Sequence, residues 1–182
     1  ISSLKGKLLF RANSYDEAEK KFRLAIEFGK EIRDKKLAEQ IIDGSYINIA
    51  SIAFQLQKYD VALDSYYKGF NSPDKVNKIV SSINMAEIFL MKNKLDSANK
   101  YFQFAEQNIP IISEKELISY LDNSLKGSKI IYDIKRGDYN KAINNLKNIQ
   151  GTSVNYTREE LLGMSYAKIG NRDSSIFYFQ KN

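Results

Sequence analysis

Residues 45–70 read SYINIASIAFQLQKYDVALDSYYKGF, and weaker copies of this stretch recur along most of the chain. The stretch predicts one helix, a tight turn and a second helix. Small residues at Ala50, Ala62 and Gly69 lie where two antiparallel helices must approach closely, and the ring of Tyr66 is placed to fill the space between them. The sequence therefore predicts antiparallel helical hairpins, one after another.

The spacing of these residues resembles the tetratricopeptide repeat (TPR). That pattern has small residues at its eighth, twentieth and twenty-seventh places and an aromatic residue at its twenty-fourth place. Ala50, Ala62, Tyr66 and Gly69 hold these four places. The resemblance implies an all-α fold, a right-handed α-solenoid of about five TPR-like antiparallel helical hairpins.

The repeats are expected in one continuous array over residues 1–182. Their approximate ranges are 1–35, 36–72, 73–112, 113–150 and 157–182. Two steps between successive copies are close to the minimal repeat of ~34 residues, and two are about ten residues longer, which predicts extra helical turns. Because the chain begins inside a repeat and stops just after an aromatic residue of the pattern, we expect it to be a fragment of a longer protein.

Several helix starts can be predicted from capping residues. Three capping boxes, in which a Ser or Thr and the Glu three residues later satisfy each other's backbone amides, are expected at Ser14 with Glu17, Ser113 with Glu116, and Thr157 with Glu160. The segment Ser72-Pro73-Asp74 predicts a cap, a first-turn proline and a charge that suits the helix dipole. In the fourth copy, Gly127 is expected to interrupt the first helix.

Composition favours an all-helical protein with a substantial core. The chain has 182 residues, 43% of them hydrophobic, and only 9 glycines and 2 prolines interrupt runs of helix-favouring residues. The sequence has no cysteine and no histidine, which excludes disulfides, thiol chemistry and histidine-based catalysis or metal binding. The neighbouring carboxylates Glu159 and Glu160 point about 100° apart on a helix, which suits solvation better than joint chemistry. We therefore expect no enzymatic activity, no cofactor and no metal site.

Compartment and charge are less informative. The absence of cysteine fits the cytoplasm and the periplasm equally well, and no apolar run approaches the ~20 residues of a membrane helix. No signal peptide is recognisable in the given chain. The net charge of +6 is distributed among interspersed lysines and carboxylates. Such mixing is typical of solvated helix faces, so we expect no direct nucleic-acid binding by this chain.

The resemblance also places a binding surface. In the TPR family, ligands bind the inner, concave wall made by the first helix of each pair. The corresponding residues here are Ile47, Ser51, Phe54, Gln55, Ile83, Glu87, Leu90, Met91, Ile131, Lys135, Met164 and Lys168. Much of this wall is apolar, and the Lys, Asn and Arg clamp with which chaperone-docking members hold a terminal carboxylate is absent. Alternatively, the apolar positions are covered within the molecule and belong to the core.

Taken with the composition, the resemblance predicts a protein or peptide interaction scaffold, the sensory or docking module of a larger bacterial protein. A protein or peptide ligand is expected in the concave groove, and a homodimer is left open. The alternative is the ligand-sensing and dimerisation domain of a transcriptional regulator whose DNA-binding part lies outside this chain. A third class is a membrane-tethered assembly factor.

Overall fold

The computed structural model describes residues 2–149 and 157–181, which form ten α-helices and one short 3-10 helix, without a β-strand among these residues. The all-α fold class is confirmed. The chain divides into two compact units, Ile1–Ile88 and Phe89–Asn182. No helix in the described part of the chain is long and apolar enough to cross a membrane.

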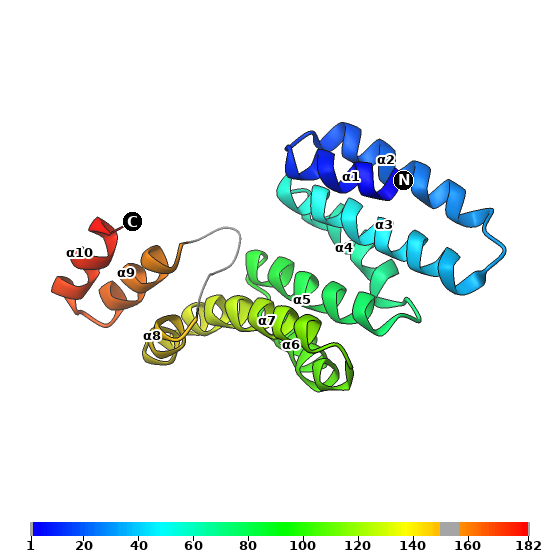
Figure 1. Ribbon diagram of the computed structural model, residues 1–182. Helices are drawn as coiled ribbons and strands as arrows, with labels where there is room; N and C mark the ends of the chain where they lie inside the picture. The colour runs from blue at the N-terminus through cyan, green and yellow to red at the C-terminus, as the bar shows by residue number, and fades with distance from the viewer. Residues whose placement is uncertain (1, 150–156, 182) are drawn as a thin grey trace. The chain divides into compact units, whose positions relative to one another are not determined.

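The first unit consists of helices that pack in sequence order (Figure 1). They are α1 (Ser2–Arg11), α2 (Tyr15–Lys30), α3 (Lys35–Gln55), α4 (Tyr59–Phe70) and most of α5 (Lys75–Met91). Helix α1 packs on α2, α2 on α3 and α3 on α4. The buried cluster between α2 and α3 contains Ala18, Phe22, Ile26, Ile49 and Ile52. Sequential packing of this kind buries the apolar stripe of each helix against its neighbour, as in an α-solenoid.

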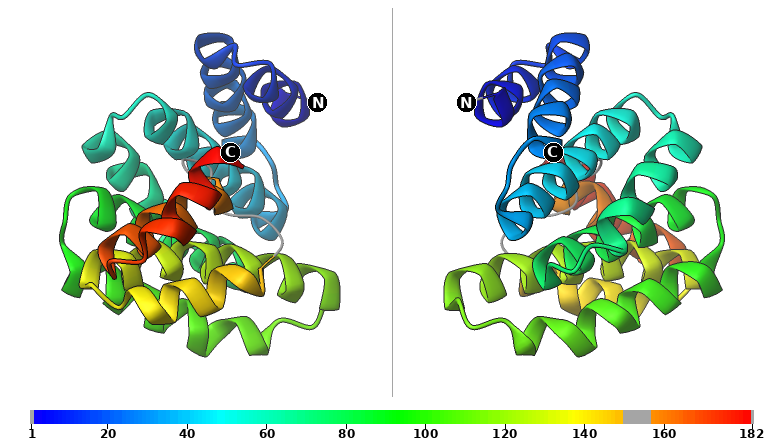
Figure 2. Two further views of the ribbon diagram at one scale, coloured as in Figure 1. Left: turned by 90° about the vertical axis from the view of Figure 1, so that its left-hand side faces the viewer. Right: turned by 90° about the vertical axis from the view of Figure 1, so that its right-hand side faces the viewer.

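The helices of the second unit also pack in sequence order. Its elements are α6 (Leu95–Asn108), η1 (Ile109–Ile111), α7 (Lys115–Arg136), α8 (Tyr139–Lys147), α9 (Arg158–Lys168) and α10 (Arg172–Gln180). Helix α6 packs on α7, α7 on α8, α8 on α9 and α9 on α10. The ring of Phe102 on α6 meets the ring of Tyr132 on α7 edge to face, with centroids 5.9 Å apart. Figure 2 shows the α9–α10 hairpin in orange and red.

The turn geometry repeats five times along the chain. A residue with positive φ lies two positions before the second helix of each pair, and these residues are Asn13, Gln57, Asn93, Gly137 and Gly170. In every case the next residue donates its backbone N–H to the carbonyl five residues earlier, at distances of 2.8 to 3.0 Å, as in the Lys58-to-Ala53 bond of 2.8 Å. This is the bond that closes a helix ending in a left-handed residue. Five equal turns explain why the helices form five hairpins.

Small residues allow close helix approach, as the sequence pattern predicts. A Cβ atom placed on Gly6 of α1 would lie 2.7 Å from Cε1 of Phe22 on α2. Real Cβ contacts are not this short, so glycine is required for the two helices to touch there. Ala18, Ala62, Ala98 and Ala142 are each fully buried.

The predicted capping boxes differ in outcome. The Thr157–Glu160 box is confirmed, because Thr157 Oγ1 accepts the Glu160 N–H at 3.1 Å and Glu160 Oε2 accepts the Thr157 N–H at 2.7 Å. The Ser14 box is wrong: Ser14 caps α2 without a side-chain hydrogen bond. Its ψ is 66°, close behind the tight turn, whereas the extended ψ of 159° at Thr157 directs the hydroxyl toward the first-turn amides.

Three further expectations for helix starts and breaks are corrected. The box at Ser113 is wrong because the cap of α7 is Glu114, one residue later. Helix α5 is capped by Asp74, whose Oδ1 accepts the Asn77 N–H at 2.8 Å, so Pro73 precedes the helix instead of opening it. Gly127 does not interrupt α7, which runs unbroken for 22 residues. A helical glycine costs about 1 kcal/mol, which the buried side chains on either side of it offset.

Candidate functional site

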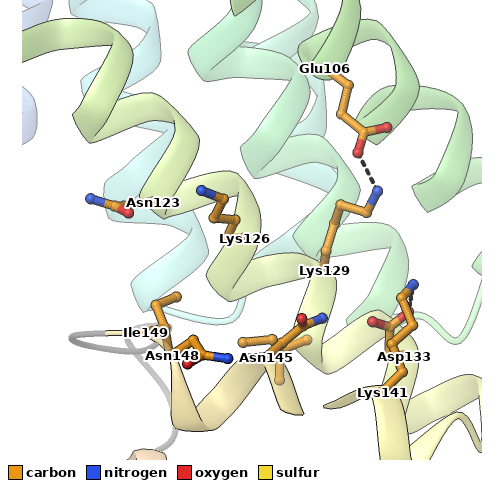
Figure 3. A pocket seen from close by; sticks show the side chains of 10 residues that line it. Glu106, Asn123, Lys126, Lys129, Asp133, Lys141, Asn145, Asn148 and Ile149 are labelled. Carbon is orange, nitrogen blue, oxygen red and sulfur yellow. Dashed lines mark hydrogen bonds and ion pairs between the residues drawn. The ribbon is translucent and has the colours of Figure 1, made fainter. Parts of the chain in front are cut away.

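The second unit has a groove lined by α6, α7 and α8, here called the α6–α8 groove (Figure 3). Its volume is about 550 Å³. The lining residues are Glu106 of α6, Asn123, Lys126, Lys129, Ile130 and Asp133 of α7, Lys141 and Asn145 of α8, and Asn148 and Ile149 after it. The residues of α7 follow helical spacing, so one face of this helix forms the floor.

Two ion pairs tie the groove together. Lys129 of α7 donates to Glu106 of α6, and Lys141 Nζ of α8 donates to Asp133 Oδ1 of α7 at 2.9 Å (Figure 3). The first pair is partly exposed, with 28% of the Lys129 side chain and 44% of the Glu106 side chain accessible. Exposed pairs of this kind contribute about 0–1 kcal/mol and exchange partners readily.

Asp133 is the unusual member of the groove. Its side chain is only 2% exposed, although that of its partner Lys141 is 59% exposed. Its Oδ2 is buried and accepts no hydrogen bond from the described residues. A buried carboxylate oxygen without a donor costs about 1–3 kcal/mol, so this arrangement lowers the folding stability.

A second hollow continues the groove along α7. It has a volume of about 170 Å³ and shares Glu106, Lys126 and Lys129 with the first. Lys126 Nζ lies 2.5 Å from Asp122 Oδ2, one helical turn earlier. The α6–α8 groove and this extension therefore follow α7 from Asp122 to Asp133.

Amide side chains line the α8 side of the groove. Asn148 donates its Nδ2 hydrogen to the carbonyl of Asn144 at 2.9 Å. Asn145 of α8 also lines the groove, and Asn123 lines it from α7. An asparagine amide both donates and accepts, so it can pair with both groups of a peptide bond.

The residues predicted for the concave wall lie elsewhere. Leu90 is fully buried and Ile83, Ile131 and Ile47 are 2%, 4% and 9% exposed, which makes all four core residues. This burial fits the alternative expectation that the apolar wall positions are covered within the molecule. Phe54, Gln55, Glu87 and Met91 are half-buried, and Met164, Lys135 and Lys168 are exposed. None of the twelve predicted residues lines the α6–α8 groove. On α7, Lys135 follows Lys126 by nine residues, or about 900°, and so lies on the opposite face.

Ser51 has a structural role in the first unit. Its hydroxyl shares a hydrogen bond of 3.0 Å with the Tyr66 hydroxyl and donates to the Ile47 carbonyl at 3.0 Å. Tyr66 is 1% exposed. Burial raises the pKa of the Tyr66 phenol above its ordinary value, and the hydrogen bond with Ser51 partly opposes this rise.

Sequence reasoning missed the groove. Asn123, Lys126, Lys129 and Asp133 form a polar stripe on α7, and such a stripe is the ordinary pattern of a solvated face. Only Asp133 could have been recognised in the sequence as unusual, because hydrophobic residues flank this carboxylate on both sides in IIYDIK. Within the described residues, no three carboxylates converge as they would for a metal ion.

Comparison with known proteins gives only distant similarity. The chain is 25% identical to the human intraflagellar transport protein 88 homolog over 174 residues, which cover 87% of this chain and 20% of that protein. The chain thus spans about a fifth of the length of this relative. No family model matches the chain, and no solved structure matches it. With the helical fold, this similarity supports a protein-interaction scaffold and no finer function.

Proposed function

We propose that the chain is a TPR-type scaffold that binds a partner protein, and that the α6–α8 groove is where a segment of the partner lies. The observation that carries the proposal is the composition of this groove. Eight of its ten lining residues are charged or amide side chains, contributed by three successive helices and by Asn148, which follows the last of them. Ordinary small-molecule pockets are mainly apolar, whereas charged and amide side chains can pair with the peptide groups and polar side chains of a polypeptide.

The buried Asp133 supports the same proposal. It fixes Lys141 at the groove although its second oxygen lacks a donor. Folding alone does not require this arrangement, because an apolar residue at a buried ion-pair position is often at least as stable. A binding role for the groove supplies a reason to keep the pair.

Site-specific photo-crosslinking tests the proposal. A photo-reactive amino acid is introduced at Asn145 in the groove and, as a matched control, at Lys135 on the opposite face of α7. We expect a partner protein to be crosslinked from position 145 and not from position 135. The identified partner is then purified and titrated against the unmodified chain by calorimetry. A partner that crosslinks equally from both positions, or that does not bind when purified, would contradict the proposal.

The regulator alternative stays a prediction. The same experiment bears on it, since a ligand-sensing and dimerisation domain would crosslink to a second copy of the chain. A homodimer crosslink, with no other protein captured, would favour that alternative.

A further inference from the structure

We infer that the α6–α8 groove binds an extended acidic segment of its partner, with carboxylate side chains at alternate positions. This inference rests on the proposed scaffold function and adds the chemistry of the ligand. It follows from three features of the groove, which are its free donors, the fixed position of Lys141 and the spacing of its lysines.

Ammonium groups outnumber carboxylates in the groove, whose lining contains three lysines and two carboxylates, Glu106 and Asp133. An ammonium group has three N–H donors, and Lys129 and Lys141 each use one of them, toward Glu106 and Asp133. Lys126 is paired with Asp122, and 61% of its side chain is exposed. Of the two carboxylates, Glu106 accepts from Lys129, and Asp133 Oδ2 is buried and out of reach of a ligand. A ligand rich in acceptors, with carboxylates and peptide carbonyls, is therefore complementary to the groove.

Asp133 acts as a positioning residue for Lys141. Lysine has a long flexible side chain that ordinarily samples many rotamers, and fixing it on binding costs free energy. The buried carboxylate of Asp133 accepts from the ammonium at 2.9 Å and so favours the rotamer that lies at the groove before the ligand arrives. Figure 3 shows the two side chains meeting at one end of the groove, with Lys129 and Lys126 following along α7.

The spacing of the lysines matches an extended chain. The floor from Asp122 to Asp133 spans eleven residues of helix, or about 16 Å, which accommodates about five extended residues. Lys129 and Asp133, which holds Lys141, are four residues apart, or about 6 Å along the axis. Side chains on one side of an extended peptide recur every ~6.6 Å. Carboxylates two residues apart can thus reach Lys129 and Lys141 together, and Asn145 lies beside them for the backbone (Figure 3).

A peptide titration tests the inference. The probe is a fluorescein-labelled hexapeptide of alternating Glu and Ser, and its control has Gln in place of every Glu. Binding is measured by fluorescence anisotropy at low and at physiological salt. We expect at least tenfold tighter binding of the Glu peptide, weakening as salt rises. Equal affinity for the two peptides would overturn the inference.

Matched variants locate the site. Lys129→Gln with Lys141→Gln is expected to remove most of the preference for the Glu peptide. Lys135→Gln with Lys168→Gln removes the same charge from exposed positions outside the groove and is expected to change affinity less than twofold. Equal losses in the two variants would show a general charge effect and overturn the site. Circular dichroism melting checks that both variants are folded.

Asp133→Asn separates positioning from simple electrostatics. This change makes the groove more positive by one charge, so a purely electrostatic attraction would strengthen binding of the Glu peptide. The positioning role predicts the opposite, a loss of at least threefold in affinity and of the Glu-over-Gln preference. Tighter binding by this variant would overturn the positioning role of Asp133.

These experiments distinguish failure of the acidic-segment inference from failure of the scaffold proposal. If the crosslinked partner binds equally to the parent chain and to the Lys129→Gln, Lys141→Gln variant, the scaffold function stands and the acidic-segment inference fails. If the Glu peptide binds in the groove and no partner protein is captured there, the ligand chemistry stands and the scaffold proposal fails.

Discussion

Two glycines of the first unit provide a sharp test of the helix packing, because the same substitution should have opposite effects at them. Gly69 lies in α4 where α3 and α5 also approach. A Cβ atom at Gly69 would lie 2.6 Å from Cγ1 of Ile47 and would also overlap Ser81 Oγ. Gly44 lies inside α3, and a Cβ atom there would meet nothing within 4 Å. Both substitutions to alanine add one methyl group to a helix interior.

The magnitudes follow from these contacts. Carbon atoms pack best at about 3.5–4.0 Å, so Gly69→Ala requires a shift of about 1 Å between helices. Overpacking of this size costs about 1–3 kcal/mol, and the better helix propensity of alanine returns about 0.5–1 kcal/mol. We expect a net loss of about 1–2 kcal/mol in the free energy of unfolding. Gly44→Ala gains the better helix propensity of alanine without overpacking, so it should raise the free energy of unfolding by about 0.5–1 kcal/mol.

Urea unfolding followed by circular dichroism measures both variants. For a chain of this size, the expected difference of about 1.5–3 kcal/mol between the two variants corresponds to about 3–12 °C in melting temperature. Ser81 supplies an internal control, since its buried Oγ has no hydrogen-bond partner in the described residues. Ser81→Ala should therefore recover part of the loss caused by Gly69→Ala. If Gly69→Ala were as stable as Gly44→Ala, the close three-helix contact at Gly69 would be refuted.

Three further predictions test single features. Thr157→Ala should lower the free energy of unfolding by about 1 kcal/mol because it removes a capping box. Ser14→Ala should change it by less than about 0.5 kcal/mol, because Ser14 makes no side-chain capping bond. Equal losses for the two variants in urea unfolding would contradict the assigned caps. By the same assay, Leu90→Ala should lower the free energy of unfolding by about 2–5 kcal/mol, because Leu90 is fully buried. Met164→Ala should lower it by less than about 0.5 kcal/mol, because Met164 is exposed. An unaffected Leu90→Ala variant would show that Leu90 is not a core residue. Because burial raises the pKa of Tyr66, its contribution to stability is fully present below about pH 10, the unfolded value, and is lost above it by up to about 1.4 kcal/mol per pH unit. Tyr66→Phe should therefore lose less stability than the parent between pH 10 and pH 11, and identical losses would refute this assignment.

The fold could be predicted because its determinants are local in the sequence. Small residues such as Ala62 and Gly69 mark helix contacts, and Gly137 and Gly170 mark turns whose positive φ glycine adopts without strain. The turn residue Gln57 could not be recognised alone, because glutamine is not favoured in the left-handed region. Its equivalence with Asn13 and Asn93 becomes visible only when the hairpins are compared.

The caps and the burial of the predicted wall required the structure. Ser14 and Thr157 have the same capping pattern in sequence, and only the backbone torsion at the cap decides whether the hydroxyl reaches an amide. Leu90 and Met91 are neighbours in the sequence, yet one is core and the other half-buried, because burial depends on which helix packs across that face. The repeat register identifies contact positions within a hairpin and leaves contacts from other hairpins undetermined.

Unequal helix lengths explain where the hollows form. Helix α7 has 22 residues and α8 only 9, so α8 can cover about 14 Å of a helix about 33 Å long. In an antiparallel hairpin the covered part is the C-terminal half of α7, and Asn123 and Lys126 lie outside it, on the floor of the α6–α8 groove. The same holds in the first unit, where α3 has 21 residues and α4 only 12. There a hollow of about 440 Å³ involves Lys36, Glu39 and Gln40, which belong to the N-terminal turns of α3. Helix α3 belongs to the second copy of the repeat and α7 to the fourth. These are the two copies that lie about ten residues farther from the preceding copy than the minimal repeat requires. The extra turns that lengthen the repeat therefore create helix surface that the second helix of the pair cannot cover, and polar side chains occupy it.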